Sequence, residues 1–371
     1  MVTAGYKLFT PLEIGEGLTL KNRIAFAPLT RGRSNPLTRV PTEINEIYYE
    51  QRAGRPVSSS PKGSGISERR PRLGTAPPAL YNEEQAAGWE EGDRPRPRQG
   101  RQDLPCSSGT SVGHSSFNSK NDLVSASAIA VPGSGLTKNN KGEAVPYETP
   151  RALETDEVAR VVEDYRHSAE LAKAAGFDGV EIHAANGYLI DQFLQSATNK
   201  RTDKYGGSFE NRARFLLEII GAIKTVWPAD RIGVRLAPNG SFGGMGSPDN
   251  AEFFPYVFEQ LSHHGLGYLA ILDGFGFGYH DKCRLLTAFD AKKAFKGTVL
   301  ANNSYTRDIA EGAVRSGAAD FVSFGRPYIS TPDLAERFEE DQSLNPDAPY
   351  EVYWDSSKGA EGYIDFPTYK A

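Results

Sequence analysis

The chain has 371 residues, of which 39% are hydrophobic and 11% aromatic, which suits one large α/β domain with an ample core. Its formal net charge of −5 excludes a general attraction to nucleic acid or to anionic membranes. The two cysteines, Cys106 and Cys283, are too few for a disulfide framework, and no run of about 18 apolar residues predicts a membrane span. Because no apolar leader follows Met1, we expect a cytoplasmic protein.

Short apolar runs predict six buried β-strands. They lie at residues 23–27, 178–184, 231–236, 268–272, 298–301 and 320–324.

Amphipathic segments between these runs predict helices. The clearest begins at Thr155, a hydroxyl residue typical of an N-cap, and Asp156 and Glu157 follow where the helix dipole favours acidic side chains. Further helices are expected over residues 211–226, 250–264, 306–316 and 332–340. Strands that alternate with helices favour a single (β/α)8 TIM-barrel domain over residues 1–371, of whose eight strands only six are recognised.

Residues 52–113 break this pattern. They contain nine arginines and eight prolines but almost no strand signal, so strands 2 and 3 of the barrel are disrupted in the sequence as written. A disordered basic insert is one interpretation, and an arm that binds nucleic acid is a second. Residues 81–89 alone look ordinary, as the start of a helix.

A third interpretation is that residues 52–113 are translated from a frame-shifted stretch. Codons can be chosen for residues 57–63 that read Leu-Ile-Ile-Ser-Glu-Gly in another frame, which is a good buried strand. Codons for residues 105–113 can likewise read Leu-Gln-Leu-Trp-His-Val-Gly-Arg. Two missing strands reappear where the barrel needs them, and we favour this hypothesis for the segment.

The most distinctive motif, at residues 183–188, follows the apolar run at 179–182. His183 and Asn186 are neutral hydrogen-bond donors that suit a carbonyl oxygen becoming negative during a reaction. Tyr188 is a phenol that suits delivery of a proton. The alternative is that the histidine and the asparagine only satisfy backbone groups at the end of a strand.

Several motifs together resemble the old yellow enzyme family of flavin-dependent ene-reductases, which includes the 12-oxophytodienoate reductases. The resemblance covers about residues 8–51 and 114–371. The segments that carry it are Ala-Pro-Leu-Thr-Arg at 27–31, the motif at 183–188, Asp-Lys-Tyr-Gly-Gly-Ser at 203–208, Phe-Gly-Arg at 324–326 and Gly-Tyr-Ile-Asp-Phe-Pro at 362–367. The resemblance implies a barrel that binds FMN and takes NADPH as its reductant.

The resemblance also implies roles for residues at strand ends. Thr30 resembles the hydroxyl that bonds to the flavin, Arg235 the cation near the flavin N1 edge, and Arg326 the arginine that binds the phosphate. The alternative for Thr30 is a turn-capping hydroxyl, and for Arg235 a structural ion pair. Tyr353 matches a wall of the substrate pocket, or is an ordinary packing aromatic. The other expected cofactor contacts are Pro28, Leu29, Asn303, Ser304 and Gly325.

Two departures from the family pattern stand out. Many members carry glycines where this chain has Asn302, Asn303 and Ser304. In addition, no residue within 52–113, as written, replaces the third-strand glutamine that binds the flavin in the family. The first departure spares the backbone amides, whereas the second removes a cofactor contact.

We therefore predict an FMN-dependent oxidoreductase that reduces the C=C bond of α,β-unsaturated carbonyl compounds with NAD(P)H. His183 and Asn186 would bind the carbonyl oxygen of a small-molecule enone, and Tyr188 would protonate its α-carbon. We expect no metal, no nucleic acid and no membrane partner, and a monomer or homodimer. The alternatives are a catalytically dead or misfolded relative that cannot hold FMN, and a phosphate-binding barrel isomerase, which would want a carboxylate or lysine base at a strand end.

Overall fold

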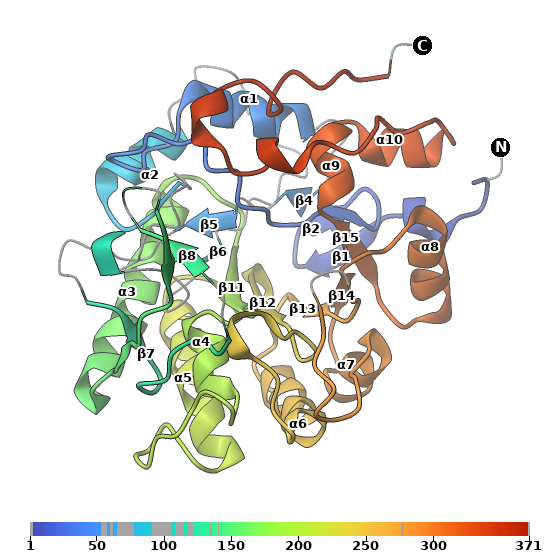
Figure 1. Ribbon diagram of the computed structural model, residues 1–371. Helices are drawn as coiled ribbons and strands as arrows, with labels where there is room; N and C mark the ends of the chain where they lie inside the picture. The colour runs from blue at the N-terminus through green and yellow to red at the C-terminus, as the bar shows by residue number, and fades with distance from the viewer. Residues whose placement is uncertain are drawn as a thin grey trace.

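The computed structural model describes residues 3–52, 58–59, 62–64, 78–90, 106–107, 115–117, 122–133, 136–139, 141, 143–275 and 278–369. Its centre is a sheet of parallel strands in the order β4-β3-β15-β14-β13-β12-β11-β6-β5, with helices packed around it (Figure 1). The strands are β3 (Ile24–Phe26), β4 (Ser58–Ser59), β5 (Lys62–Ser64), β6 (Cys106–Ser107), β11 (Val180–Ala184), β12 (Ile232–Leu236), β13 (Tyr268–Leu272), β14 (Val299–Asn302) and β15 (Phe321–Phe324).

The chain itself joins the two ends of this sheet. β4 pairs with β3 at one end, and β5 pairs with β6 at the other. Ser59 and Lys62 are separated by three residue steps, so they lie within about 11 Å of each other. In an open sheet of this order they would be roughly 38 Å apart, because neighbouring strands are about 4.8 Å apart. The sheet therefore closes into a barrel, and β4 and β5 together supply its second strand.

All six strands predicted from apolar runs are present, as β3, β11, β12, β13, β14 and β15. The expectation that strands 2 and 3 are disrupted is not confirmed, because β4 and β5 occupy the second position and β6 the third. Apart from Arg52, these strands and residues 78–90, which include α2 (Glu83–Glu90), the predicted frame-shifted segment 52–113 lies outside the described residues.

Helices stand where the amphipathic segments predicted them, with one correction at a helix start. Thr155 is the first residue of its helix, and Glu154 occupies the N-cap. The Glu154 N–H donates to the Glu157 carboxylate at 2.9 Å, whereas the Thr155 hydroxyl donates to Asp203 at 2.5 Å. The helices are α1 (Glu43–Arg52), α3 (Thr155–Ala174), α4 (Leu189–Leu194), α5 (Phe209–Ile223), α6 (Asn250–Ser262), α7 (Ala288–Ala294), α8 (Arg307–Ser316), α9 (Arg326–Ser330) and α10 (Leu334–Glu339). None of the described helices is long and apolar enough to span a membrane.

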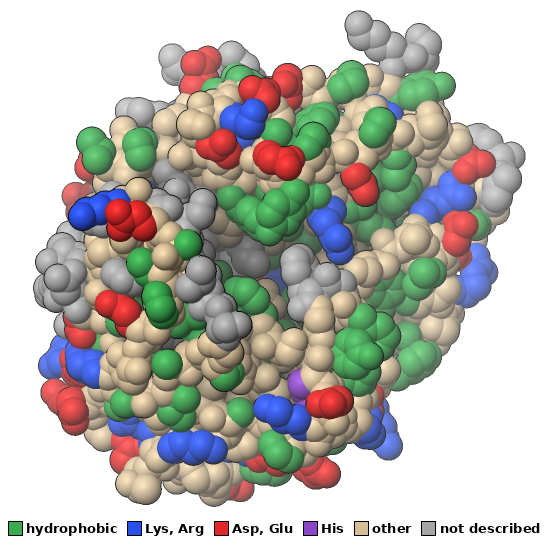
Figure 2. Space-filling view, in the orientation of Figure 1, with side chains coloured by type: hydrophobic (Ala, Val, Ile, Leu, Met, Phe, Trp, Pro, Cys, Tyr) green, Lys and Arg blue, Asp and Glu red, His purple; other side chains and the backbone are tan. Residues whose placement is uncertain are grey.

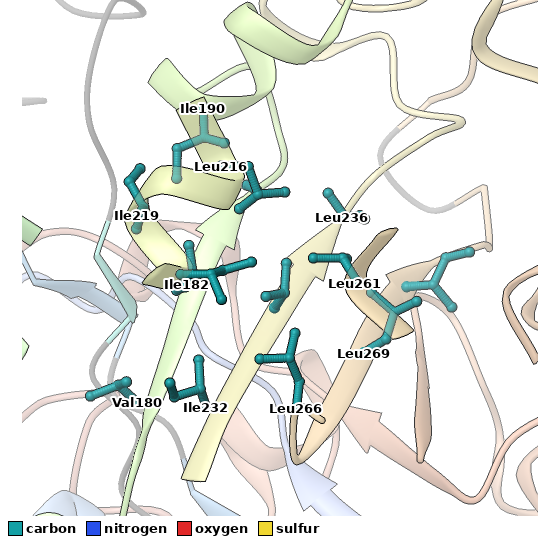
Figure 3. Packing of buried hydrophobic residues seen from close by; sticks show 14 of the residues in the cluster. Val180, Ile182, Ile190, Leu216, Ile219, Ile232, Leu236, Leu261, Leu266 and Leu269 are labelled. Carbon is teal, nitrogen blue, oxygen red and sulfur yellow. The ribbon is translucent and has the colours of Figure 1, made fainter. Parts of the chain in front are cut away.

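One face of each strand packs against the surrounding helices. Val180 and Ile182 of β11 and Ile232 of β12 lie in the same buried cluster as Leu216 and Ile219 of α5 (Figure 3). Full burial of such a side chain stabilises a fold by about 1.5–3 kcal/mol. Because side chains alternate along a strand, the intervening residues point into the barrel.

A β-hairpin, β1 (Leu12–Gly15) with β2 (Leu18–Leu20), covers the amino end of the barrel. The Glu16 N–H donates to Asp230, just before β12, at 2.9 Å. The hairpin joins inward residues of the strands in one buried cluster, made of Ile14, Leu20, Ala25, Tyr268, Ala270, Leu300 and Phe321. The amino end is thus filled with apolar side chains, which leaves the carboxyl end for a site.

The frame-shift hypothesis makes a testable prediction about the gene. Sequencing of the transcript should show compensating insertions or deletions near codons 52–62 and 91–113. A frame-restored chain, with Leu-Ile-Ile at the position of β4, should also resist urea better, because each buried aliphatic side chain adds about 1.5–3 kcal/mol. A transcript that encodes the residues as printed, in one open frame, would show the hypothesis to be wrong.

Candidate active site

The carboxyl ends of the strands open into a cavity of about 1070 Å³. Figure 2 shows the molecule hollowed near the centre of the face turned to the viewer, with hydrophobic side chains beside the opening. Most residues predicted from the sequence line this one cavity, namely Pro28, Leu29, Thr30, Asn186, Tyr188, Arg235, Asn303, Ser304, Gly325 and Arg326. Their elements, from β3 to β15, are far apart in the sequence, so closure of the barrel brings them together.

His183 and Tyr353 are not among the residues that line the cavity. His183 is fully buried on β11, opposite Arg235 in the strand register, and its ring centroid lies 5.2 Å from that of Tyr188. His183 therefore lies directly beside the predicted proton donor, which itself lines the cavity. Its predicted contact with a substrate stays a prediction.

A tight turn sets the positions of Asn186 and Tyr188. The Tyr188 N–H donates to the Ala185 carbonyl at 3.3 Å, and the two central residues, Asn186 and Gly187, have φ of +58° and +72°. Two positive φ values in succession are characteristic of a type I′ turn, for which Asn-Gly is the favoured pair. A Cβ atom at Gly187 would lie only 2.8 Å from the Phe242 carbonyl oxygen, so a larger residue would displace a neighbouring loop.

A buried ion pair lies beneath the cavity. Arg235 donates through Nε and Nη2 to the two carboxylate oxygens of Glu181, at 2.7 and 2.9 Å, and both side chains are almost fully buried. The Tyr268 hydroxyl donates to the same carboxylate at 2.9 Å. The tyrosine ring crosses the barrel where Gly233 leaves room, since a Cβ there would lie 2.3 Å from the ring. Arg235 thus forms the structural ion pair and also lines the cavity.

Positive φ values mark the predicted phosphate region. Asn303 and Ser304, directly after β14, have φ of +96° and +64°, in the region that glycine adopts without strain. The Asn303 side chain donates to the Gly274 carbonyl at 2.8 Å. Gly325 and Arg326 follow the neighbouring strand β15 and line the same part of the wall. Backbone amides beside an arginine are a donor set that suits a phosphate.

A C-terminal segment forms one wall of the cavity, and only the adjoining Tyr353 was predicted from the sequence. Tyr353 packs against two members of this wall, with ring centroids 5.5 Å from Tyr350 and 5.8 Å from Trp354. Burial raises the pKa of the Tyr353 phenol. The clustered aromatics at 350–354 were a signal that this stretch packs against something. The lining residues it contributes are Asp347, Tyr350, Glu351, Trp354, Asp355 and Ser356.

Arginines hold this wall against the loop after β3. Arg31 donates to the Tyr48 hydroxyl and the Gly362 carbonyl, both at 2.7 Å, and to the Tyr353 carbonyl at 3.1 Å. The rings of Tyr48 and Tyr363 stack with centroids 4.1 Å apart, and the Arg31 guanidinium lies about 5 Å from each. Arg31 therefore links the segment that carries Thr30 to the C-terminal wall.

Comparison with known proteins identifies the family. Residues 7–345 match the NADH:flavin oxidoreductase / NADH oxidase family. The chain belongs to this family. The resemblance to old yellow enzyme is thereby confirmed, and with it an α/β barrel of that type.

Relatives from several kingdoms match almost the whole chain. The chain is 34% identical to a putative 12-oxophytodienoate reductase 5 from Oryza sativa subsp. japonica, over 98% of this chain and 96% of that protein. It is 37% identical to a chanoclavine-I aldehyde reductase from Penicillium roqueforti (strain FM164), over 97% of this chain and 96% of that protein. It is 34% identical to a probable flavin mononucleotide-dependent alkene reductase from Leishmania infantum, over 97% of each chain.

Solved structures show the same fold. Morphinone reductase in complex with tetrahydroNAD superposes with a TM-score of 0.87 at 36% identity, covering 98% of both chains. The old yellow enzyme homologue from Zymomonas mobilis superposes with a TM-score of 0.88 at 35% identity, covering 97% of this chain and 99% of that one.

The strain after β14 can be tested by substitution. Ser304→Gly should raise the free energy of unfolding by roughly 0.5–1 kcal/mol, because relief of the left-handed conformation exceeds the added entropy of a glycine. Urea denaturation measures this change. Ser304→Ala, which removes the same hydroxyl but keeps the strain, is the control and should give no gain. A glycine variant less stable than the alanine variant would contradict the argument.

Proposed function

We propose that this protein is an FMN-dependent ene-reductase that reduces the C=C bond of α,β-unsaturated carbonyl compounds with a reduced nicotinamide. The observation that carries the proposal is one cavity that gathers Thr30, Arg235, Asn303 and Arg326 beside Asn186 and Tyr188. The first group suits a flavin phosphate and its polar edge, and the second suits binding of a carbonyl oxygen and protonation of the neighbouring carbon.

The donor set of the cavity fits FMN. Amides at Asn303 and Ser304 with the Arg326 guanidinium would hold the phosphate, while Thr30 and Arg235 would hold the flavin ring. A cavity of about 1070 Å³ is at the upper end of ordinary ligand pockets, which leaves space for a cofactor and a substrate together. FMN, when bound and reduced, supplies the hydride that the protein itself cannot provide.

The chain's own residues would bind the substrate and move a proton. His183 and Asn186 would donate to the carbonyl oxygen and stabilise the negative charge that grows on it. Tyr188 would give its phenolic proton to the α-carbon. The wall with Tyr350, Tyr353 and Trp354 would cover the apolar part of the substrate and exclude water.

NADPH is our prediction for the reductant. The tetrahydroNAD found with morphinone reductase favours NADH as the alternative. The ratio of kcat/KM for the two nucleotides decides between them. We also propose a cytoplasmic protein that acts on a small-molecule enone as a monomer or homodimer.

The competing functions have less support. A dead or misfolded relative would lack strands 2 and 3, whereas β4, β5 and β6 fill these positions. A barrel isomerase needs a basic carboxylate or lysine at the reacting atoms. Here, by contrast, His183 lies near the end of β11, and Asn186 and Tyr188 follow this strand.

The phosphate contact gives the first functional prediction. Arg326→Ala should weaken FMN binding by roughly 1.5–3 kcal/mol, because a charge-assisted hydrogen bond to the phosphate is lost. Equilibrium dialysis of FMN against the apoprotein measures the change. Arg307→Ala is the control, since Arg307 pairs with Asp308 and Asp341 away from the cavity lining. Equal FMN affinity in both variants would remove Arg326 from the phosphate site.

The predicted proton donor, Tyr188, gives the second functional prediction. Tyr188→Phe should slow the reoxidation of the reduced protein by cyclohexenone roughly 10²–10⁴-fold, because proton transfer is lost. Reduction by the nicotinamide should stay nearly unchanged. Stopped-flow spectroscopy measures both half-reactions separately.

Tyr305→Phe is the matched control for this variant. Tyr305 also lines the cavity, but its hydroxyl donates to Asp273 at 3.0–3.1 Å. If Tyr188→Phe slows both half-reactions equally, or neither, Tyr188 is not the proton donor.

A further inference from the structure

A carboxylate with no role in the scheme above lies directly under the Asn186–Gly187 turn. Asp191 of α4 is fully buried. One of its oxygens accepts from the Gly187 N–H at 2.9 Å, and the other accepts from Gln195 Nε2, also at 2.9 Å. On the other side of the same glycine, Gln192 Nε2 donates to the Gly187 carbonyl at 2.5 Å. The central glycine of the turn is therefore held by hydrogen bonds at both of its peptide groups.

The hydrogen bonds continue from Asp191 to the loop after β12. Gln195 Oε1 accepts from the Gly246 N–H at 2.7 Å and from Asn250 Nδ2 at 3.2 Å. Gly246 belongs to the same loop as Phe242, which lines the cavity. The turn that carries Asn186 and the loop that carries Phe242 are thus connected through one buried carboxylate and one amide.

This arrangement suits the ionised carboxylate and not the acid. Both groups that face the Asp191 oxygens are N–H donors, so a proton on either oxygen would face a donor. Rotation of the Gln195 amide would offer an acceptor, but it would break the bonds of Oε1 to Gly246 and Asn250. Protonation therefore loosens either the Gly187 turn or the Phe242 loop.

We propose that Asp191 is a positioning residue whose ionised form holds the Asn186–Gly187 turn in the shape that binds a substrate carbonyl. Binding of a carbonyl compound is then coupled to loss of the Asp191 proton. The inference rests on the proposed function, because it assumes that Asn186 contacts the carbonyl oxygen.

The ionisation of Asp191 falls in a range where this coupling can be measured. Burial raises the pKa of Asp191 to about 7, against the lowering effect of the bonds from Gly187 and Gln195. Ionisable groups on the surrounding elements include Glu181 and His183 on β11, Tyr188 at the end of the turn, Arg212 on α5 with its partner Asp249, and His280, which contacts Asn250; α5 also carries Glu210, Arg214 and Glu218. None of them is among the causes of the raised pKa.

The probe is cyclohexanone, a carbonyl compound that neither ionises nor carries a C=C bond to reduce. Its affinity for the oxidised, FMN-loaded protein should rise about fivefold or more between pH 6 and pH 8, a coupling of ordinary size. Isothermal titration calorimetry measures it. Asp191→Asn, which keeps the size of the side chain, should abolish the rise.

A second variant separates Asp191 from His183 as the titrating group. Gln195→Met removes a donor that stabilises the ionised carboxylate, so the midpoint of the rise should move to higher pH. Asp273→Asn is the matched control, because Asp273 is a partly buried carboxylate with a raised pKa that lies after β13 (Tyr268–Leu272) and is bonded to Tyr305 and not to the turn. In the Asp273→Asn variant, the affinity for cyclohexanone should still rise with pH, with its midpoint near pH 7.

Thermal unfolding gives a readout that does not depend on a ligand. A raised pKa means that the folded protein keeps a proton that the unfolded chain loses at an ordinary carboxyl pKa. The stability that Asp191 contributes therefore falls as the pH increases from about 4 to 7. The Tm of the wild type should fall more over this window than the Tm of Asp191→Asn.

The outcomes distinguish a failure of the proposed carbonyl site at Asn186 from a failure of the proposed role of Asp191. If Asn186→Ala leaves the affinity for cyclohexanone unchanged, the proposed function is wrong at its carbonyl site. If Asn186→Ala weakens binding while wild type and Asp191→Asn share one pH dependence, only the role of Asp191 is overturned. The role of Asp191 is also overturned if the midpoint of the rise in affinity is the same in Gln195→Met as in the wild type.

Discussion

Closure of the parallel sheet into a barrel is the constraint on which the site depends. β4 bonds to β3 and β5 bonds to β6, so these two short strands, which are neighbours in the sequence, hold the two ends of the strand order together. Thr30 follows β3, whereas Asn186 and Tyr188 follow β11. They line one cavity because the carboxyl ends of all strands meet at one rim of a closed parallel barrel. An open sheet with the same strands would separate a cofactor site from a substrate site.

Charge inside the barrel adds a second constraint. Removing one partner of a buried ion pair typically costs 3–5 kcal/mol, because the other charge is left without compensation. Glu181 therefore fixes Arg235 more firmly than a surface carboxylate could, and Tyr268 fixes Glu181 in turn. The guanidinium is held in the wall before any ligand arrives. Such preorganisation is what a site needs if charge is to be stabilised without rearrangement.

Much of this arrangement could be predicted from the sequence, for a physical reason. Six of the strands contain short apolar runs that alternate with amphipathic helices, so they were recognisable, and their ends directed attention to Asn186, Tyr188 and Arg326. Glu181 and Asp191 were not singled out, because the importance of a buried carboxylate depends on its hydrogen-bond partners. The partner of Glu181, Arg235, is distant in the sequence, and the partners of Asp191 are recognised only when the turn before α4 is known. The wall at Tyr350 and Trp354 was missed for the same reason, since only the fold brings it across the cavity.

Strands 2 and 3 could not be predicted because their residues have no strand signal. Serine, glycine and lysine at 58–64 lack the β-branched and aromatic side chains that favour strands, yet ladder hydrogen bonds come from the backbone, and neighbouring strands can impose them on almost any sequence. The register agrees with the shifted reading frame. Its Leu-Ile-Ile spans codons 57–60, where Ser58 and Ser59 pair with β3, and its glutamine spans codons 106 and 107, where Cys106 and Ser107 pair with β11. Because the codons were chosen to yield strands, this match does not test the frame shift, which stays a prediction for the transcript to decide; the backbone pairing alone places β4, β5 and β6 in the barrel.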